Sequence, residues 1–449
     1  MDKSSKNTSL LSIILFITIV ALIYSTQNMI SPNLLMISEY FGFGEETTQL
    51  GVLTFTFTLL SGISMIIFGY LADKIIRKWI VFGGTLMYSF FSVMTVFVPR
   101  GLTGYYWFFF LTCMNGIGYG AIIPSVFSLI GDLISQDNRS KGFSFFSIAS
   151  LIGMALGMGL ATIAGQFDWR VSFFVVGITG FVNSIFIFSF KEPSRIGKDF
   201  EDVVDKEAVE YTYRIKRDDL NYVFKKKSNI FLIINFVDTI PTGIILFLLY
   251  AYMEDFHNVP SDLTLVFLGV ILLSTLAGTV IFGFIGDHLF QKGYKKARVY
   301  LALMANIVPI PFVFISLLIP FEAPSGASLL TLLTIPGAIL MMILISTGLF
   351  INGAVNGSWY ATVVDINLPE HRATVLAAAN FFDIIGRAIG PLIGTIIADA
   401  YGLLSGMMIS IVFWIFLPFF WIPVLRNVKQ EMERTNELLK ARIKELKNN

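Results

Sequence analysis

Long stretches without a charged residue recur along this chain, and they restrict the folds that are open to it. The chain has 449 residues, of which 55% are hydrophobic and only 14% are charged. A helix that crosses the hydrocarbon core of a bilayer needs about 20 predominantly apolar residues. The sequence therefore predicts an all-α, multi-pass membrane protein and excludes an ordinary soluble globular domain.

Twelve apolar windows are long enough to cross a membrane. The first is interpreted as a membrane span rather than a cleaved signal peptide, because it is uncharged and long. The tenth is long enough for two spans, but Pro324 and Gly326 near its start predict a short loop and one long helix. The windows cover residues 7–38, 47–72, 79–99, 101–131, 142–167, 171–190, 228–253, 263–286, 299–321, 323–364, 373–398 and 400–425.

The positive charges agree with twelve spans and with both termini on the cytoplasmic side. Cytoplasmic loops of membrane proteins are enriched in Lys and Arg. With this topology, 29 of the 32 Lys and Arg residues fall in cytoplasmic segments. Arg100 and Arg170 fall on the external side, and Arg387 falls inside a span. A wrong number of spans would distribute the Lys and Arg residues over both sides of the membrane.

Polar segments divide the chain into two halves, a connector and a tail. We expect six-helix halves at residues 1–190 and 228–426, a cytoplasmic linker at 191–227 and a charged cytoplasmic tail at 427–449. The linker mixes basic and acidic residues, which favours a solvated connector with some helix. A lipid-surface patch at Lys225, Lys226 and Lys227 is the alternative. Alternating charges in the tail predict a short exposed helix.

Two sets of residues show that the halves are duplicates. Gly69 and Asp73 stand between two spans and precede Arg77 and Lys78, while Gly283 and Asp287 repeat this hinge in the second half. In a second set, each residue of the first half has a counterpart in the second half at the same distance along the chain. This set includes small residues spaced by four, which allow close approach of helix backbones. It pairs Asp132 and Arg139 with Asp365 and Arg372, and the stripe Gly153, Gly157, Ala161 and Gly165 with Gly386, Gly390, Gly394 and Ala398.

These hinge residues resemble the signature loop of the major facilitator superfamily. Residues 169–170 and 369–372 are also similar to that family, and the resemblance covers nearly the whole chain. It implies a twelve-helix transporter of two homologous halves that works by alternating access. A weaker resemblance, at residues 124–133, 192–195 and 380–394, is to spinster-type transporters of lysophospholipids and sphingolipid-like lipids.

Two departures from the spinster pattern concern ion coupling. Members of that group carry an acidic residue in the first span and an arginine in the fourth, both linked to proton coupling. The first span here reads Tyr24-Ser25-Thr26-Gln27-Asn28, and the fourth has Thr112 at the arginine position. Either proton coupling depends on other residues here, or this protein is not coupled to protons.

Polar residues inside the spans follow helical spacing and are the candidate substrate-binding residues. Polar groups are costly in hydrocarbon unless they face a cavity or a partner. Steps of three and four place each set on one helix face, and the resemblance implies that spans 1, 4, 7 and 10 line a cavity. The alternative for the asparagines is hydrogen bonding that holds the bundle together. The candidates are Tyr24, Gln27, Asn28, Asn115, Tyr119, Asn235, Asp238, Asn352, Asn356, Tyr360, Asp383 and Arg387.

Three charged residues in the second half are the strongest candidates. Asp383 and Arg387 lie four residues apart and can pair on one helix. Asp238 lies close to Pro241 and Gly243, where a helix is expected to kink. We expect these three to bind a charged head group, carry a proton, or both. A structural ion pair that locks spans 7 and 11 together is the alternative.

The hinges are the candidate gating residues. By resemblance, Asp73 is expected to cap the N-terminus of span 11, where a carboxylate meets the positive end of the helix dipole. The basic residues of the first hinge would join Asp132 and Arg139 in a salt-bridge cluster that closes the cytoplasmic side. The second hinge has a looser basic loop and is expected to be a relic of the duplication or a weaker partner. The gating set is Gly69, Asp73, Arg77, Lys78, Asp132, Arg139, Gly283, Asp287, Asp365 and Arg372.

Other classes of function find little support in the chain. A single cysteine and three scattered histidines predict no catalytic or metal site, and no phosphate-binding loop indicates an ATP-driven pump. We expect no cofactor and no nucleic-acid partner. The expected partners are the lipid bilayer and a small-molecule or lipid substrate, with a monomer in the cell membrane. The runners-up are a facilitator or efflux transporter for organic anions or drug-like compounds, and a non-transporting sensor of the same fold.

Overall fold

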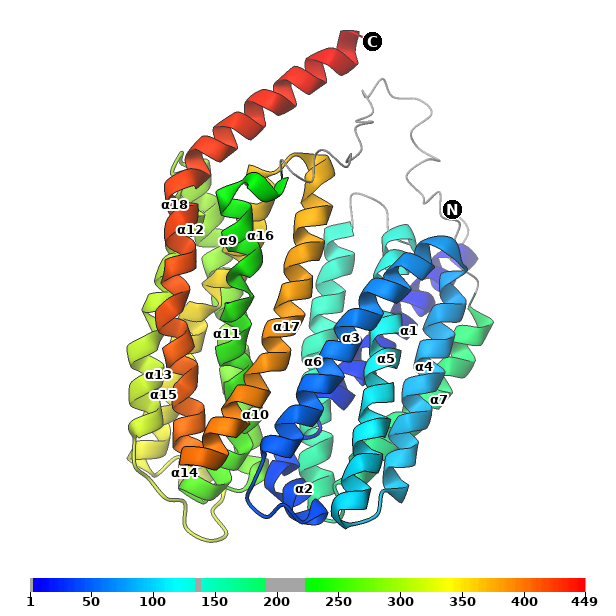
Figure 1. Ribbon diagram of the computed structural model, residues 1–449, viewed down its shortest axis with the longest axis vertical. Coiled ribbons are helices and arrows are strands. Elements are labelled where there is room, and N and C mark those ends of the chain that lie inside the picture. Colours follow the sequence, from blue (N-terminus) through cyan, green and yellow to red (C-terminus); the bar gives the residue numbers. More distant parts are fainter. Residues whose placement is uncertain (1–2, 134–138, 191–222, 449) are drawn as a thin grey trace. The chain divides into compact units, whose positions relative to one another are not determined.

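The computed structural model describes residues 3–133, 139–190 and 223–448, and the regular structure in these parts is entirely helical (Figure 1). The chain divides into two compact units, residues 1–206 and 207–449. Each unit is a bundle of long helices. An all-helical architecture suits a chain whose backbone polar groups must be satisfied in hydrocarbon.

The first unit contains the helices of the first six predicted spans. The first span ends in a short 3₁₀ turn with Pro32, after which the chain continues as α2. Its elements are α1 (Lys3–Gln27), η1 (Ser31–Asn33), α2 (Leu34–Phe41), α3 (Thr48–Lys74), α4 (Arg77–Met94), η2 (Thr95–Phe97), α5 (Gly101–Leu133), α6 (Arg139–Gly165) and α7 (Arg170–Ser189).

The second unit contains the remaining six spans, several of which are broken into consecutive helices. Its elements are α9 (Lys227–Ile234), η5 (Asn235–Asp238), α10 (Thr239–His257), α11 (Ser261–Gln291), α12 (Ala297–Ile307), α13 (Pro309–Leu318), α14 (Leu329–Leu332), α15 (Pro336–Asn352), α16 (Ala354–Ile366), α17 (Pro369–Tyr401) and α18 (Leu403–Asn448).

The helices agree with the twelve predicted windows. Within the described residues, eleven helical stretches are long and apolar enough to cross a membrane. Helix α6, whose fully described apolar part is Ala149–Gly165, occupies the window of the fifth predicted span. The long tenth window contains the short helix α14 and one span made of α15 and α16, as expected from Pro324 and Gly326.

The same pairs of helices pack together in both units. In the first, α1 packs on α6, α3 and α4 pack on α5, and α4 packs on α7. In the second, α10 packs on α17, α11 and α12 pack on the α15–α16 span, and α12 and α13 pack on α18. Each second-unit pair is the counterpart of a first-unit pair six spans earlier. This repeated packing is the structural form of the duplication seen in the sequence.

The stripes of small residues lie where helix backbones approach each other closely. A methyl group added at Gly157 of α6 would overlap the carbonyl oxygen of Ser25 in α1. A methyl group added at Gly390, the counterpart in α17, would lie 2.8 Å from the carbonyl oxygen of Ile240 in α10. Glycine at both positions therefore allows contact between backbones.

The charged tail is helical as predicted, but it is part of a long helix and not a short one. Residues 427–448 continue α18 without a break, and the helix extends past the rest of its bundle (Figure 1). Most of the predicted linker, residues 191–222, lies outside the described part of the chain.

Candidate functional site

Aromatic rings gather around the predicted polar residues of the first unit. Tyr24 of α1 and Tyr119 of α5 meet edge to face, with ring centroids 5.7 Å apart. Phe57 of α3 contacts the same Tyr119 ring at 6.1 Å. Such arrangements of aromatic pairs are favourable beyond the area they bury. The structure thus brings together Tyr24 and Tyr119, two site residues that lie far apart in the sequence.

The amide side chains among the predicted polar residues of the first unit differ in their hydrogen-bond partners. Asn28 donates a hydrogen bond from Nδ2 to the carbonyl oxygen of Tyr24 in its own turn, at 2.8 Å. Asn115, one helical turn before Tyr119, is only 4% exposed, and its Oδ1 atom receives no hydrogen bond from the described residues. Gln27 is half-buried. A buried acceptor without a donor is costly, so Asn115 is suited to receive a hydrogen bond from a bound molecule.

The seventh span is interrupted at its predicted charged residue. A 3₁₀ turn, η5, ends at Asp238 and separates α9 from α10, which confirms the break expected near Pro241. Asn235 begins this turn. Its side chain is 5% exposed, and its Oδ1 atom also has no hydrogen-bond partner among the described residues. Interrupted spans expose backbone and side-chain polar groups to a cavity, which is how many transporters form binding sites.

The predicted charge pair is present in α17. Arg387 donates from Nε to Oδ2 of Asp383 across one helical turn, at 3.0 Å. The side chain of Arg387 is 55% exposed and that of Asp383 is 32% exposed, so both can meet a ligand. Thr239 donates to the backbone oxygen of Asp383 at 3.2 Å, and Asp238 interacts electrostatically with both charged residues. The three predicted charges therefore form one cluster within the second unit.

The predicted residues of the tenth span have mixed surroundings. Asn352 donates a hydrogen bond to the carbonyl oxygen of Ala305 in α12, at 3.3 Å, which supports the alternative that it holds helices together. Tyr360 is exposed and packs edge to face on Trp359 at 4.8 Å. The side chain of Asn356 lies outside the described part of the structure.

The second hinge has an ion-pair cluster. Arg298, near the start of α12, pairs with Asp287 at 2.6 Å and also with Asp365 at the end of α16. Its guanidinium lies over the ring of Phe290, 4.1 Å from the centroid. One arginine thus joins the hinge aspartate to the aspartate of the duplicated pair. The expectation of a weaker second hinge did not foresee this contact.

The first hinge is described only in part. Arg77 is 3% exposed, and Lys78 lies over the rings of Trp79 and Phe188. Gly69 faces Pro124 of α5, whereas a methyl group at Gly283 would meet open space. The side chains of Asp73, Asp132, Arg139 and Arg372 lie outside the described part of the structure.

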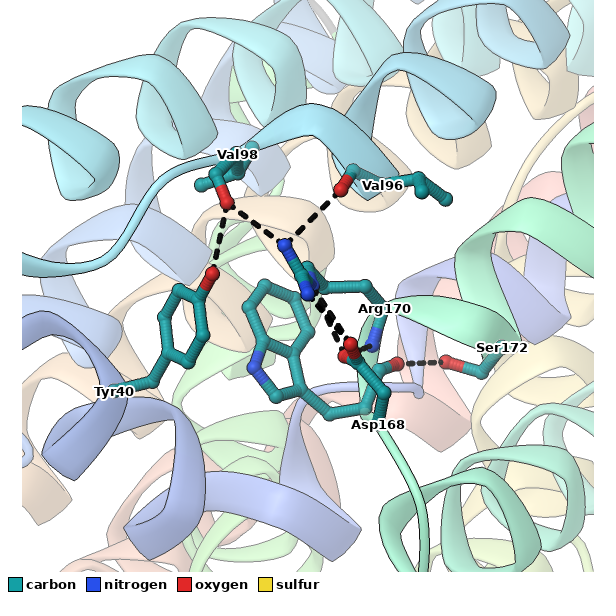
Figure 2. A network of polar contacts seen from close by, with 7 residues as sticks. Tyr40, Val96, Val98, Asp168, Arg170 and Ser172 are labelled. Atoms are coloured by element: carbon teal, nitrogen blue, oxygen red, sulfur yellow. Dashed lines mark hydrogen bonds and ion pairs between the residues drawn. The ribbon is translucent and has the colours of Figure 1, made fainter.

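Two polar networks were missed at the level of sequence. The first surrounds Arg170, which pairs with Asp168 at 2.6 Å and donates to the carbonyl oxygens of Val96 and Val98 (Figure 2). Tyr40 donates to the oxygen of Val98 as well, at 2.9 Å. The guanidinium of Arg170 holds the pKa of Asp168 below its usual range. The adjacent Asp168, Trp169 and Arg170 were the available signal in the sequence. Val96 and Val98, to which Arg170 donates, lie far from it along the chain.

The second missed network is centred on Lys226, directly before α9. Its Nζ donates to the carbonyl oxygen of Ile366 at 2.6 Å and to the hydroxyl of Thr435 at 3.3 Å. Thr435, on the tail part of α18, donates to the same carbonyl at 2.8 Å. Lys226 therefore anchors the tail helix inside the protein, which argues against its role in a lipid-surface patch.

These clusters are suited to binding and positioning a molecule. The described parts of the chain contain no group of three or more His, Cys, Asp or Glu residues that could hold a metal ion. Each unit instead offers a buried amide oxygen without a donor, and the second unit adds an accessible charge pair.

Comparison with known sequences gives the family. The sequence model of the Major Facilitator Superfamily matches residues 16–349. The chain belongs to the Major Facilitator Superfamily. Several of the proteins that it resembles are named as transporters, and none of those reported below is named as an enzyme.

Relatives within this superfamily include spinster proteins. The chain is 29% identical to mouse Protein spinster homolog 1 over 175 residues, and 31% identical to the zebrafish (Danio rerio) Sphingosine-1-phosphate transporter SPNS2 over 182 residues. These matches cover 37% and 38% of this chain. They span only 32% and 34%, about a third, of the length of the relatives. The transporter YybO of Bacillus subtilis is 23% identical over 266 residues, 56% of this chain and 60% of YybO.

Solved structures agree with the fold. A bacterial homologue of the human lysosomal transporter spinster, in an inward-facing and unoccupied conformation, matches with a TM-score of 0.77 and 16% identity. The match covers 96% of this chain and 99% of that chain. A D-xylose–proton symporter matches with a TM-score of 0.65 and 15% identity, over 93% and 97% of the two chains. At these identities the likeness concerns the fold alone.

Proposed function

We propose that this chain is a secondary transporter that moves an amphiphile with one charged end, of the lysophospholipid type, by alternating access. The observation that carries the proposal is the difference between the predicted polar residues of the two units. The first unit offers aromatic rings and a neutral amide, while the second offers Asp238, Asp383 and Arg387. An amphiphile with one charged end has both an apolar and a charged surface to be recognised.

The charge cluster suits a head group that carries both signs. Arg387 can pair with a phosphate, since guanidinium groups bind phosphate oxygens with two parallel hydrogen bonds. Asp383 and Asp238 can receive an amine of the same head group. The buried oxygens of Asn115 and Asn235 would accept hydrogen bonds from hydroxyl or amide groups of the substrate.

The relatives support this class of substrate, because one of them is named for sphingosine-1-phosphate transport. The second candidate is an organic-anion or drug-like compound facilitator, which the accessible Arg387 would also serve. The two candidates differ in whether the substrate needs an acyl chain.

Reconstituted vesicles can separate these candidates. Purified protein would be tested for movement of a fluorescent lysophospholipid and, in parallel, for uptake of small radiolabelled carboxylates. We expect the lysophospholipid to be moved and an unlabelled lysophospholipid to compete with it, while the carboxylates neither move nor compete. Uptake of carboxylates without movement of the lipid would favour the organic-anion facilitator.

We further propose that both termini are cytoplasmic, that residues 1–190 and 228–426 act as the moving halves, and that the protein works as a monomer in the cell membrane. The distribution of Lys and Arg supports this orientation. Protons are candidate coupling ions, with Asp238 and Asp383 as their carriers.

The hinges form the proposed latch. Arg298 joins Asp287 to Asp365 in the second unit. We propose that the duplicated positions Asp73, Arg77 and Asp132 form a corresponding cluster, which helps to hold the cytoplasmic side closed. Rigid halves that rock about a central site need such a contact to favour one state.

A further inference from the structure

A cavity outside the candidate substrate site lies between the loop that joins α11 to α12 and the helix α18. Its volume is about 490 Å³, and its walls come from the end of α11, residues 293–297, the first turns of α12 and Lys429. All of these residues belong to the second unit. The cavity lies at the ends of membrane-crossing helices, where the hydrocarbon region gives way to lipid head groups.

The polar side of this cavity is basic. Lys295 and Lys296 line it from the loop, and Lys429 lines it from α18. The described lining residues include no acidic side chain. Lys429 pairs with Glu433, one turn further along α18, at the long distance of 4.0 Å, and both of these side chains are about three-fifths exposed. Three lysines from two separate elements therefore line one cavity, and no carboxylate of the described residues lines it with them.

The other side of the cavity is apolar and open. Tyr294, Tyr300 and Met304 line it with exposed fractions of 64%, 50% and 52%. Tyrosine favours the boundary between membrane and water, because its ring is apolar and its hydroxyl is polar. A free phosphate ion would contact only the lysines and would leave this apolar wall unused. A molecule with an anionic head and an acyl chain would use both.

We propose that this cavity is a binding site for an anionic phospholipid of the bilayer, distinct from the transported substrate. The three lysines hold the phosphate, and the first acyl carbons lie against Tyr300 and Met304. Basic residues beside membrane helices attract anionic lipids. The loop lies on the cytoplasmic side in the proposed orientation. A lipid bound here joins the hinge loop, which directly precedes Arg298 of α12, to the tail helix anchored by Lys226.

The test is lipid binding by the full-length protein, which is independent of transport. Purified protein depleted of lipid would be titrated with phosphatidylglycerol and with phosphatidylcholine, and bound lipid would be counted by native mass spectrometry. The test variant is Lys295→Gln/Lys296→Gln/Lys429→Gln. The control variant is Lys292→Gln/Arg426→Gln/Lys440→Gln. It removes three basic residues of the same loop and helix that do not line the cavity.

We expect phosphatidylglycerol to bind the wild-type protein and the control alike. The test variant should bind it on the order of a hundredfold more weakly, since each cation contributes a factor of about five at an anionic surface. Met304→Trp, which keeps the charges and fills the apolar wall, should also weaken binding. Equal binding by the test variant, an equal loss in the control, or binding of inorganic phosphate as tight as that of the lipid would each overturn the proposal.

Discussion

Lys226 shows how one residue can connect parts of the chain that are far apart in sequence. It lies just outside the seventh span and donates to Ile366 and Thr435, which belong to α16 and to the tail part of α18. Nearby, the amides of Asn229 and Asn367 bond to each other at 2.8 and 2.7 Å. A lysine in such a place loses solvation that its charged form needs.

Burial lowers the pKa of Lys226 from 10.5 to about 8, against the smaller opposing effect of Glu431, while Arg434 adds to the lowering. Between these two values the unfolded chain binds more protons than the folded protein. The free energy of unfolding must therefore rise with pH through this window. We predict that Lys226→Met abolishes this rise, as measured by thermal unfolding in detergent at a series of pH values.

Lys225→Met is the matched control for this prediction. Lys225 is exposed and lies next to Lys226. The control should keep the alkaline rise in stability. The same pH dependence in both variants would show that another group causes it.

At the scale of elements, the glycine contacts explain why two pairs of helices can pack so closely. Gly157 lies against Ser25, and Gly390 lies against Ile240. We predict that Gly157→Ala and Gly390→Ala each lower the free energy of unfolding by about 1–3 kcal/mol, because a methyl group forces the backbones apart. Chemical or thermal unfolding in detergent measures the effect.

Gly83→Ala in α4 is the control, because a methyl group there would meet open space. It should be neutral or stabilising by up to about 1 kcal/mol, since alanine favours helix more than glycine does. An equal loss in all three variants would mean that close helix packing is not the reason for glycine in the stripes.

The elements also show which features can be predicted from sequence. Apolar windows, the break at Asp238 and the pairing of Asp383 with Arg387 depend on residues close together in the chain, and periodicity or spacing reveals them. The bridge from Asp287 through Arg298 to Asp365 depends on how three helices pack. So does the burial of Lys226 against Ile366. Such contacts leave no local pattern. The tail was expected to be a short exposed helix, because its alternating charges do not show that it continues the last span as α18.

At the scale of the whole molecule, the account requires two states that the hinge residues help to select. Asp73→Asn removes a charge from the proposed latch while it keeps the shape of the side chain. We predict a shift of the population toward the inward-open state, because the cytoplasmic contacts are weakened. Distances between spin labels on the cytoplasmic ends of the two halves measure this shift.

Asp287→Asn gives a useful comparison, since Asp287 is paired with Arg298 within one unit. Loss of this pair should lower the stability of the second unit more than it shifts the distances. Unchanged distances in Asp73→Asn would contradict the latch and leave Asp73 as a residue for folding or topology.

The central claim is that the charge cluster of the second unit recognises the head group of a transported amphiphile. Its most direct test is the rate at which reconstituted vesicles move a fluorescent lysophospholipid. Arg387→Gln should lower kcat/KM by roughly 10- to 100-fold, since a hydrogen bond to a charged group contributes about 1.5–3 kcal/mol. Arg387→Lys should keep part of the activity, and Arg100→Gln, outside the cluster, should match the wild-type protein. Full activity of Arg387→Gln would contradict the claim.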